Sequence, residues 1–237
     1  MEQRVLITGA SRGLGAALAR TVARRGHRVF LAARSPAELE QRAAEIARLH
    51  GSAAVAWQAC DLRHGAQADA LAAAATRTLG GVDVLINNAG IGAYRPFLEN
   101  RVEELDEVLA LNLAAPMRLA HALLPGMLER GRGYLIHVAS DLARRPLARM
   151  APYVASKHGL LGFAASLHRE FRAEGIRVTT VLPGIIDSAF NGATEGSRDA
   201  RWALPTDALA EQIAALLELP PTMVIDELVV HPAEGDY

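Results

Sequence analysis

Two residue types are nearly missing from the chain, and each scarcity limits what the protein can be. One cysteine, Cys60, stands among 237 residues, which excludes an internal disulfide and fits a reducing compartment. Lysine is as scarce, because 24 of the 25 basic residues are arginines and Lys157 is the only lysine. A sequence that uses arginine everywhere else has an ammonium group at this one position, which makes the position a candidate functional site.

Patterns that would indicate several other classes of protein are missing too. The net charge is -1, and no block of basic residues indicates nucleic-acid binding. No apolar run approaches transmembrane length, and the first strand-like run, residues 4–8, leaves no room for a signal peptide. The eight histidines show no zinc-like spacing with one another or with Cys60. We therefore expect a cytoplasmic protein without a nucleic-acid, membrane or metal partner.

Short apolar runs alternate with longer helical patterns along the whole chain. Most of the runs lack polar alternation, which is typical of parallel strands buried on both faces. The alternation predicts an α/β fold, with a doubly wound, mainly parallel, seven-stranded sheet and helices on both faces. No linker or repeat divides the chain, so we expect a single domain over residues 1–237. The predicted strands are residues 5–8, 28–33, 53–58, 84–87, 133–139, 177–182 and 224–230, and the predicted helices are residues 14–25, 36–50, 67–79, 102–129, 152–173 and 206–217.

A glycine-rich turn, Thr8-Gly-Ala-Ser-Arg-Gly-Leu-Gly15, connects the first predicted strand to the first predicted helix. Its glycines would let the backbone approach a pyrophosphate, and the helix N-terminus would add a partial positive charge. The alternative is an ordinary glycine turn, but the position between a strand and a helix is the context that such a motif requires. The turn therefore predicts a dinucleotide-binding site.

The end of the second predicted strand, Ala32-Ala-Arg-Ser35, indicates which dinucleotide is bound. In NAD sites an acidic residue about twenty positions after the glycines binds the ribose hydroxyls, whereas a nearby arginine accommodates the extra phosphate of NADP. Here Arg34 follows Gly15 by 19 positions, and no carboxylate stands at the strand end. Arg12, inside the turn, is a second candidate. We therefore expect NADP(H) to be preferred over NAD(H); the alternative is that these arginines are merely solvated.

Polar and glycine residues follow the next two predicted strands. Cys60-Asp-Leu62 follows the third strand and Asn87-Asn-Ala-Gly90 follows the fourth. Open α/β sheets bind ligands at the carboxyl ends of their strands, so we expect both segments at the cofactor site. The alternative for Asp61 is the N-cap of the next helix, and the alternative for Asn88 and Gly90 is a simple turn.

The lone lysine belongs to the segment Ala151-Pro-Tyr-Val-Ala-Ser-Lys-His158. Pro152 suits the first turn of a helix, where Tyr153 and Lys157 would share one face. An ammonium group beside a phenol stabilises the phenolate, so the pair predicts a tyrosine that is made easier to ionise. The alternative is an ordinary pair of surface side chains, but arginine, which the chain uses elsewhere, would be a poor substitute for a compact ammonium here.

Together these motifs resemble those of the short-chain dehydrogenase/reductase family. The resemblance runs from Val5 to about Ser188, and it also includes Leu111-Asn-Leu113, Ser140 and Pro183-Gly184. It implies a Rossmann-type fold and a commonly dimeric or tetrameric protein.

The resemblance also implies which residues form the site. Its catalytic tetrad is Asn112, Ser140, Tyr153 and Lys157, with Ser140 standing 13 positions before Tyr153. Lys157 would also bind the nicotinamide ribose, and Asn112 would hold a water that links Lys157 to solvent. The implied cofactor-binding residues are Gly9, Ser11, Arg12, Gly13, Leu14, Gly15, Arg34, Asp61, Leu62, Asn88, Ala89, Gly90, Tyr153, Lys157, Pro183, Gly184, Ile186 and Ser188.

Three positions depart from the family pattern. The family often has paired serines and a downstream glycine where this chain has Ala139-Ser140 and Ala143. Asp141 directly follows Ser140 and brings a carboxylate near the expected position of the substrate carbonyl. The Pro-Gly segment usually ends in threonine and here ends in Ser188, which keeps a hydroxyl for the nicotinamide amide. None of the departures removes a catalytic group.

The chemistry of these groups predicts an NADP(H)-dependent oxidoreductase that reduces a carbonyl or oxidises a secondary alcohol. Hydride transfer to a carbonyl leaves negative charge on its oxygen, which Ser140 would stabilise and Tyr153 would protonate. Pro116 removes a backbone hydrogen bond to the Asn112 carbonyl, which independently predicts a water there. The alternatives are a regulatory protein that binds NADP without turnover and an epimerase or dehydratase on a related fold.

Two further expectations concern assembly and access to the site. The predicted helices 102–129 and 152–173 are apolar around much of their circumference, which predicts a homodimer or homotetramer. Residues 187–205 are rich in glycine, alanine and charged residues and have few packing side chains. We expect this segment to form a mobile lid over a small-molecule substrate.

Arginines between Ser140 and Tyr153 raise a hypothesis about the substrate. By resemblance this segment forms a rim of the substrate pocket, whose apolar part would be Ile91, Leu142 and Ile185. Arginines favour carboxylate or phosphate groups, so an acidic group of the substrate or its carrier would dock at this rim. The alternative is that these arginines face water or a neighbouring subunit, because Asp141 opposes an anion placed deep inside. The arginines are Arg144, Arg145 and Arg149.

Overall fold

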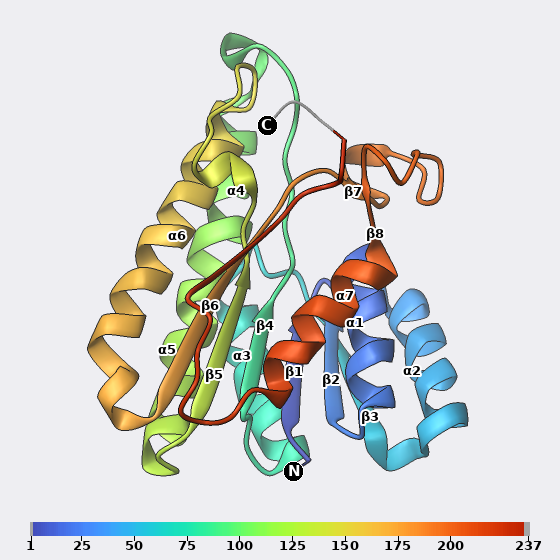
Figure 1. Cartoon of the computed structure of the whole chain (residues 1–237), viewed down its shortest axis with the longest axis vertical. Helices are drawn as coiled ribbons and strands as arrows, with labels where there is room; N and C mark the ends of the chain where they lie inside the picture. Colours follow the sequence, from blue (N-terminus) through green and yellow to red (C-terminus); the bar gives the residue numbers. More distant parts are fainter. Residues whose placement is uncertain (1, 235–237) are drawn as a thin grey trace.

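Seven parallel strands form the central sheet of the protein (Figure 1). The computed structural model describes residues 2–234, apart from the side chain of Asn191. The strand order β3-β2-β1-β4-β5-β6-β9 reverses direction at β1, which makes the sheet doubly wound. The predicted fold class is therefore confirmed. The strands are β1 (Arg4–Thr8), β2 (Arg28–Ala33), β3 (Val55–Ala59), β4 (Val84–Asn87), β5 (Gly133–Val138), β6 (Ile176–Pro183) and β9 (Glu227–Val230).

Helices cover both faces of this sheet (Figure 1). One face carries α1 (Gly13–Arg24), α2 (Pro36–His50) and α7 (Thr206–Ala215), and the other carries α3 (Gly65–Leu79), α4 (Val102–Leu109), α5 (Ala115–Glu129) and α6 (Ala151–Phe171). Successive residues of β1 show why the strand has no polar alternation. Val5 and Ile7 pack into the first layer while Leu6 packs into the second, and all three are fully buried.

The predicted helix 102–129 is interrupted near its middle. A π-helical turn, Ala110–Ala114, separates α4 from α5 and contains Asn112. Pro116 follows in the first turn of α5 and cannot donate the backbone hydrogen bond that an α-helix would require there. The sequence therefore contained the cause of the interruption. The whole stretch Val102–Glu129 has the length and apolar composition of a membrane-spanning helix, and 44% of its most apolar window is buried inside the protein.

The segment 187–205 is anchored at both ends by a short ladder. β7 (Ile186–Asp187) pairs in parallel with β8 (Leu204–Pro205). Between them, a carboxylate oxygen of Asp187 accepts hydrogen bonds from the backbone N–H groups of Gly196 and Arg198, at 3.1 and 3.4 Å. Two side chains of this segment, Phe190 and Trp202, line the central cavity of the molecule and are 37% and 52% exposed.

A buried polar pair lies near the carboxyl ends of β4 and β5. Asn87 and His137 are register partners, and the Asn87 Nδ2 lies 3.2 Å from the His137 Nδ1. The histidine is fully buried, and its ring lies edge-on to Phe163 of α6. Burial first, and the nearby charge of Lys157 second, lower the pKa of His137 to about 3. The imidazole is therefore neutral in the folded protein at physiological pH.

This pair makes the stability of the protein dependent on pH. Below its ordinary pKa, a histidine of the unfolded chain binds a proton that His137 does not bind until the pH approaches about 3. We expect the free energy of unfolding to fall by up to ~1.4 kcal/mol per pH unit in this window. In His137→Asn this contribution should vanish, so wild type should lose about 2 kcal/mol more than the variant between pH 7.5 and 5.0.

Urea unfolding at the two pH values measures the difference, with the exposed His50 replaced by asparagine as the control for losing an imidazole. Equal pH dependence in wild type and His137→Asn would contradict the prediction.

Candidate active site

A cavity of about 1410 Å³ opens where the loops that follow the parallel strands meet. Segments distant in the chain converge there because all carboxyl ends of a parallel sheet share one edge. The cavity is lined by every residue that the sequence predicts as catalytic or cofactor-binding, with Asn112 as the exception. The predicted residues in its wall are Gly9, Ser11, Arg12, Gly13, Leu14, Gly15, Arg34, Asp61, Leu62, Asn88, Ala89, Gly90, Ser140, Tyr153, Lys157, Pro183, Gly184, Ile186 and Ser188.

The glycine-rich turn brings bare backbone to the cavity wall. Gly9 and Gly13 have φ values of 66° and 54°, which residues other than glycine rarely adopt. A Cβ on Gly15 would lie 2.1 Å from the carbonyl oxygen of Gly9. Helix α1 begins at Gly13 immediately after the turn, so its unpaired N-terminal N–H groups lie at the same wall. An anion at this wall would meet both close backbone and the positive end of the helix.

Asn88 connects this turn to the end of β4. Its Nδ2 donates to the carbonyl of Thr8 at 2.9 Å, and the hydroxyl of Thr8 accepts from the backbone N–H groups of Asn88 and Ala89 at 3.0 and 3.1 Å. The Asn88 amide is therefore engaged by the protein, although the residue lines the cavity. Its evident contribution is to fix the turn against β4.

Two cationic side chains line the cavity without a local partner. Arg12 and Arg34 are exposed, and neither guanidinium makes a hydrogen bond or an ion pair with any residue in the range 2–234 that the structure describes. Arg34 directly precedes Ser35, the N-cap of α2, whose hydroxyl accepts from the Glu38 backbone N–H at 3.3 Å. A carboxylate, that of Glu38, lines the cavity as well. Near the end of β2, the cavity wall therefore has two guanidinium groups without an ion-pair partner, those of Arg12 and Arg34, and one carboxylate, that of Glu38.

Asp61 does not cap the following helix. Helix α3 begins at Gly65 with His64 as its N-cap, so the N-cap alternative is wrong. The Asp61 carboxylate instead accepts hydrogen bonds from Arg63, and these bonds lower the pKa of Asp61 to about 2. Arg63 also pairs with Glu107 on α4 at 2.8 Å. Asp61 thus sits in the cavity wall within a network of charges.

Tyr153 lies in the first turn of α6 and is 9% exposed, with its ring against Gly92 and near Phe190. Burial raises the pKa of Tyr153 to about 12; a hydrogen bond with Ser140 acts in the opposite direction, and the charge of Asp141 adds to the increase. The sequence predicts a tyrosine made easier to ionise by Lys157. In this structure the cost of burying the phenolate is the larger effect.

Lys157 lies one turn further along α6, as the spacing predicts. It is 3% exposed, and its Nζ donates to the carbonyl of Val138 at 2.8 Å. The ammonium lies 5.7 Å from the centroid of the Tyr153 ring. Burial lowers the pKa of Lys157 to about 8. The side chain is therefore poised between its charged and neutral forms.

Asn112 lies behind the cavity wall rather than in it. Its side chain makes a two-way pair with Ile91, accepting from the Ile91 N–H at 2.9 Å and donating to the Ile91 carbonyl at 2.8 Å. It also donates to the Ser156 hydroxyl at 3.0 Å. The side chain therefore joins the loop after β4 to helix α6. The π-helical turn keeps the backbone of Asn112 beside this junction.

Ser140 follows β5 and caps a short 3₁₀ turn, Asp141–Ala143. Its hydroxyl donates to the Oδ1 of Asp141 at 3.1 Å and accepts from the Leu142 backbone N–H at 3.2 Å. The other carboxylate oxygen of Asp141 lies 3.9 Å from Arg145 and 3.8 Å from the His231 ring. The departure noted in the sequence thus places a carboxylate in direct contact with the candidate catalytic serine.

The three arginines of the predicted rim have partners within the protein. Arg144 pairs with Glu227 of β9, Arg145 approaches Asp141, and the Arg149 guanidinium stacks over the Tyr94 ring at 5.3 Å. Arg149 also has a φ of 69°, and its carbonyl accepts from the Arg95 N–H at 3.0 Å. These contacts favour the interpretation that the arginines stabilise the rim itself.

The mouth of the cavity is more aromatic than the sequence alone indicates. Tyr94 and Trp202 are 60% and 52% exposed and line it together with Leu147 and Ile185. Aromatic residues make up only 5% of the chain. Two large aromatic residues in polar loops are therefore unusual in this sequence, and this was the signal by which Tyr94 and Trp202 could have been predicted. His231, beside Asp141, carries no such signal, because it enters the site only through the fold.

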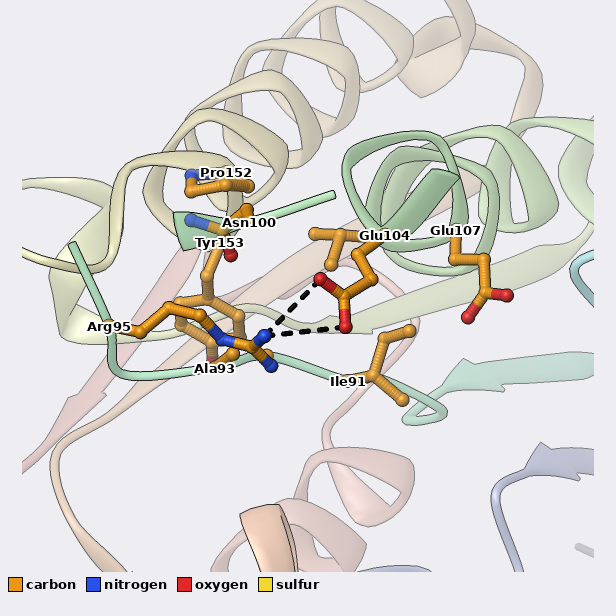
Figure 2. A pocket seen from close by; sticks show the side chains of 10 residues that line it. Ile91, Ala93, Arg95, Asn100, Glu104, Glu107, Pro152 and Tyr153 are labelled. Carbon is orange, nitrogen blue, oxygen red and sulfur yellow. Dashed lines mark hydrogen bonds and ion pairs between the residues drawn. The ribbon is translucent and has the colours of Figure 1, made fainter. Parts of the chain in front are cut away.

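A second, smaller cavity of about 130 Å³ lies behind Tyr153, between α4 and the loop after β4. Figure 2 shows Arg95 reaching across it to Glu104, whose carboxylate oxygens lie 3.2 and 3.3 Å from the guanidinium. Ile91, Gly92 and Tyr153 line both cavities. The tyrosine therefore separates the large cavity from a polar recess.

The chain is similar to several proteins of known name. The chain is 36% identical over 239 residues to the 3-oxoacyl-(acyl-carrier-protein) reductase FabG of Vibrio cholerae, covering 98% of this chain and 96% of the relative. An alcohol dehydrogenase of Thermococcus sibiricus, solved with 5-hydroxy-NADP, superposes with a TM-score of 0.93 at 29% identity over all of both chains. A metagenomic short-chain oxidoreductase, solved with NADP, gives a TM-score of 0.84 at 35% identity over 98% of each chain.

The family model described as short chain dehydrogenase matches residues 3–199, which include the glycine-rich turn, both polar strand ends, Ser140, Tyr153 and Lys157. With the parallel sheet and the cavity at its carboxyl edge, this match is decisive: the chain belongs to the short-chain dehydrogenase/reductase family of oxidoreductases.

Proposed function

We propose that the protein is an NADP(H)-dependent oxidoreductase that reduces the carbonyl of a small molecule, or oxidises the corresponding secondary alcohol, in the cytoplasm. The observation that carries the proposal is the convergence of Ser140, Tyr153 and Lys157 on one cavity with the glycine-rich turn. A relative named as a reductase supports the same assignment, as do an alcohol dehydrogenase solved with 5-hydroxy-NADP and a short-chain oxidoreductase solved with NADP.

The chain's residues fit a nicotinamide dinucleotide. The pyrophosphate would lie against Gly13–Gly15, where a Cβ on Gly15 would already collide with backbone. Arg12 and Arg34 would bind the additional phosphate of NADP. Lys157 would bind the nicotinamide ribose, and the buried hydroxyl of Ser188 would bind the nicotinamide amide. When bound, the cofactor supplies or accepts the hydride.

Side chains of the protein stabilise the charge that develops on the carbonyl oxygen and transfer the proton to it. As the carbonyl oxygen gains negative charge, Ser140 donates a hydrogen bond to it and Tyr153 delivers the proton. Lys157 then favours the phenolate left on Tyr153, because a nearby ammonium stabilises that anion. Burial raises the pKa of Tyr153 and so keeps its hydroxyl protonated until the proton is transferred to the substrate oxygen. Phe190 and Trp202, from the segment 187–205, would cover the apolar part of the substrate as a lid.

Replacing Tyr153 by phenylalanine tests the proton donor. We expect NADPH to bind almost as in wild type while turnover of a ketone falls by at least roughly 100-fold, because general acid catalysis contributes that much or more. Binding is measured by fluorescence titration and turnover by NADPH absorbance, over a panel of ketones, aldehydes and quinones.

Tyr134→Phe is the matched control, since it removes the hydroxyl of another buried tyrosine. Tyr134 lies near the start of β5, and its hydroxyl hydrogen-bonds with that of Thr179 on β6. A Tyr153→Phe enzyme that kept more than about a tenth of wild-type turnover would refute the role. Tight NADPH binding without turnover by wild type on any substrate would favour the regulatory alternative.

Arg34→Ala tests the cofactor preference. The guanidinium has no described partner to lose, so we expect the substitution to weaken NADPH binding by roughly tenfold to a hundredfold, the value of a charge-assisted hydrogen bond. NADH binding should change little, because NADH lacks the extra phosphate. Dissociation constants for both cofactors measure this.

Arg48→Ala, at the far end of α2, controls for the loss of one positive charge. Equal wild-type affinity for NADPH and NADH would overturn the preference and would direct attention to Glu38 as a ribose ligand.

Exposed apolar side chains on the outer layer support assembly. Leu109 and Met117 are 41% and 43% exposed on the stretch that contains α4 and α5, beyond the face that meets the sheet. Helices that are apolar beyond one face favour burial on a second side. We therefore propose a homodimer or homotetramer that pairs these helices with those of another copy.

Sedimentation velocity at micromolar concentration should detect no monomer of wild type, and Met117→Glu should shift the protein toward smaller species by placing charges in the interface. Leu49→Glu, on α2 at the other face of the sheet, should leave the assembly intact. A monomeric wild type would exclude the proposed assembly.

A further inference from the structure

Exposed aromatic rings gather in the large cavity. The chain has five phenylalanines, four tyrosines and two tryptophans. Among residues 2–234, which the structure describes, the rings that line this cavity are those of Tyr94, Tyr153, Phe190 and Trp202. Tyr94 and Trp202 are each more than half exposed, so a large part of both rings is accessible to a ligand. Exposed apolar surface inside a cavity indicates a ligand that has apolar surface of its own.

Phe190 lies beside the candidate proton donor. Its ring centroid is 5.9 Å from that of Tyr153, and the two ring planes are tilted by 57°. The loop after β4 packs closely on the same tyrosine, because a Cβ on Gly92 would lie 2.8 Å from the Tyr153 ring, and Tyr94 follows two residues later in that loop. A ketone whose oxygen meets Tyr153 would therefore place its neighbouring group in the part of the cavity that these rings line.

The Tyr94 ring is held in place by the loop that precedes α6. The Arg149 guanidinium lies 5.3 Å from the ring centroid, within the range of a cation–π contact. The backbone carbonyl of Arg149 accepts from the N–H of Arg95, which is itself bonded to Glu104 of α4 (Figure 2). Arg149 also has a φ of 69°, a conformation that costs free energy unless surrounding contacts fix it. The ring is thus positioned before a ligand arrives, which lowers the entropic cost of binding.

Charged side chains from the predicted rim and lid already have partners in the protein. Arg145 faces Asp141 at 3.9 Å, Asp199 pairs with Arg201 at 2.6 Å, and Arg198 donates to a backbone carbonyl of β7 at 2.7 Å. A carboxylate on the substrate would have to displace one of these partners or lie beside Asp141 or Asp199, and both arrangements are costly. An uncharged group meets neither cost.

We propose that the substrate is an uncharged ketone that carries an aromatic ring, and that Phe190, Trp202 and Tyr94 bind this ring. The inference rests on the proposed function, because it names the substrate class of that same site. Aromatic rings pack on one another in offset or edge-to-face geometry, so side chains of this kind favour a flat ring over an aliphatic chain of similar size. The arginines of the rim then support the wall of the pocket and do not bind the substrate.

Three ketones test the charge and the ring. Acetophenone is uncharged and aromatic, para-acetylbenzoate is its carboxylated analogue, and butanone has no ring. With NADPH, wild type should give a kcat/KM at least roughly tenfold higher for acetophenone than for para-acetylbenzoate, because the carboxylate would displace an existing pair. An equal or higher kcat/KM for para-acetylbenzoate would overturn the assignment of an uncharged substrate.

Trp202→Leu removes a ring and keeps apolar bulk. We expect it to lower the ratio of kcat/KM for acetophenone to that for butanone by roughly threefold to tenfold, the value of one aromatic pair, and Trp202→Phe to retain most of the wild-type ratio. Phe97→Leu removes an exposed ring outside the cavity wall and should leave the ratio unchanged. Phe190→Leu is the second variant if Trp202→Leu does not fold. A wild-type ratio in both leucine variants would overturn the recognition of a ring.

Tryptophan fluorescence measures binding without turnover. Trp57→Phe leaves Trp202 as the only tryptophan of the chain, and Trp202→Phe leaves Trp57, on the edge strand β3, as the control for collisional quenching and for absorbance by the ketone. Acetophenone should quench Trp202 saturably, whereas para-acetylbenzoate at the same concentrations should not.

The two measurements together separate this proposal from the proposed function. Saturable quenching of Trp202 by acetophenone without turnover of any ketone would refute the proposed function and leave the binding of an uncharged aromatic ring standing. Turnover of ketones without quenching of Trp202 by acetophenone would refute the aromatic site alone. Quenching by NADPH but by no ketone would mean that the ring covers the cofactor, and would also overturn the proposal.

Discussion

An ammonium group held out of water is the constraint on which the rest of the site depends. Burying a charge is costly unless the charge is hydrogen-bonded, and Lys157 is 3% exposed. The Val138 carbonyl satisfies one of its three protons. Glycine at position 90 keeps space beside the nitrogen, because a Cβ there would lie 3.6 Å from Nζ. Burial lowers the pKa of Lys157 to about 8, so further acceptors at this point, where the proposed ribose would lie, would stabilise its charged form.

The wall around that ammonium is held together before any ligand arrives. Asn88 and Thr8 join the glycine-rich turn to β4, while Asn112 joins the next loop to α6 through Ile91 and Ser156. The side-chain amides of Asn88 and Asn112 hydrogen-bond to other groups of the protein. The wall is therefore already in place and does not have to reorganise during a reaction. The hydrogen bonds of Asn88 and Asn112 within the protein give both motif asparagines a structural role that does not depend on contact with a cofactor.

Sequence patterns predicted the sheet and named many of the residues that line the cavity, because both depend on local signals. The inner strands are apolar runs buried on both faces, whereas the edge strands β3 and β9 are partly exposed. The glycine-rich turn and the Tyr153–Lys157 spacing are short motifs. What the patterns missed depends on contacts between distant segments. The pairing of Asp141 with His231 joins residues 90 positions apart, and Trp202 reaches the cavity only because β7 and β8 pair. The π-helical turn is intermediate: Pro116 indicated a missing hydrogen bond but not how the helix would adjust.

Charge balance separates the arginines in and beside the cavity wall into two kinds. Arg63 and Arg145 each face a carboxylate, so an incoming anion would have to displace Asp61 or Asp141 and leave that carboxylate beside the ligand. Arg12 and Arg34 face no such competitor within the described chain, and an anion there would gain a charge-assisted hydrogen bond without breaking one. An abundance of arginine in the sequence therefore says little about anion binding. The partner that each arginine already has decides which of them remain available, and here these lie beside the glycine-rich turn and at the end of β2.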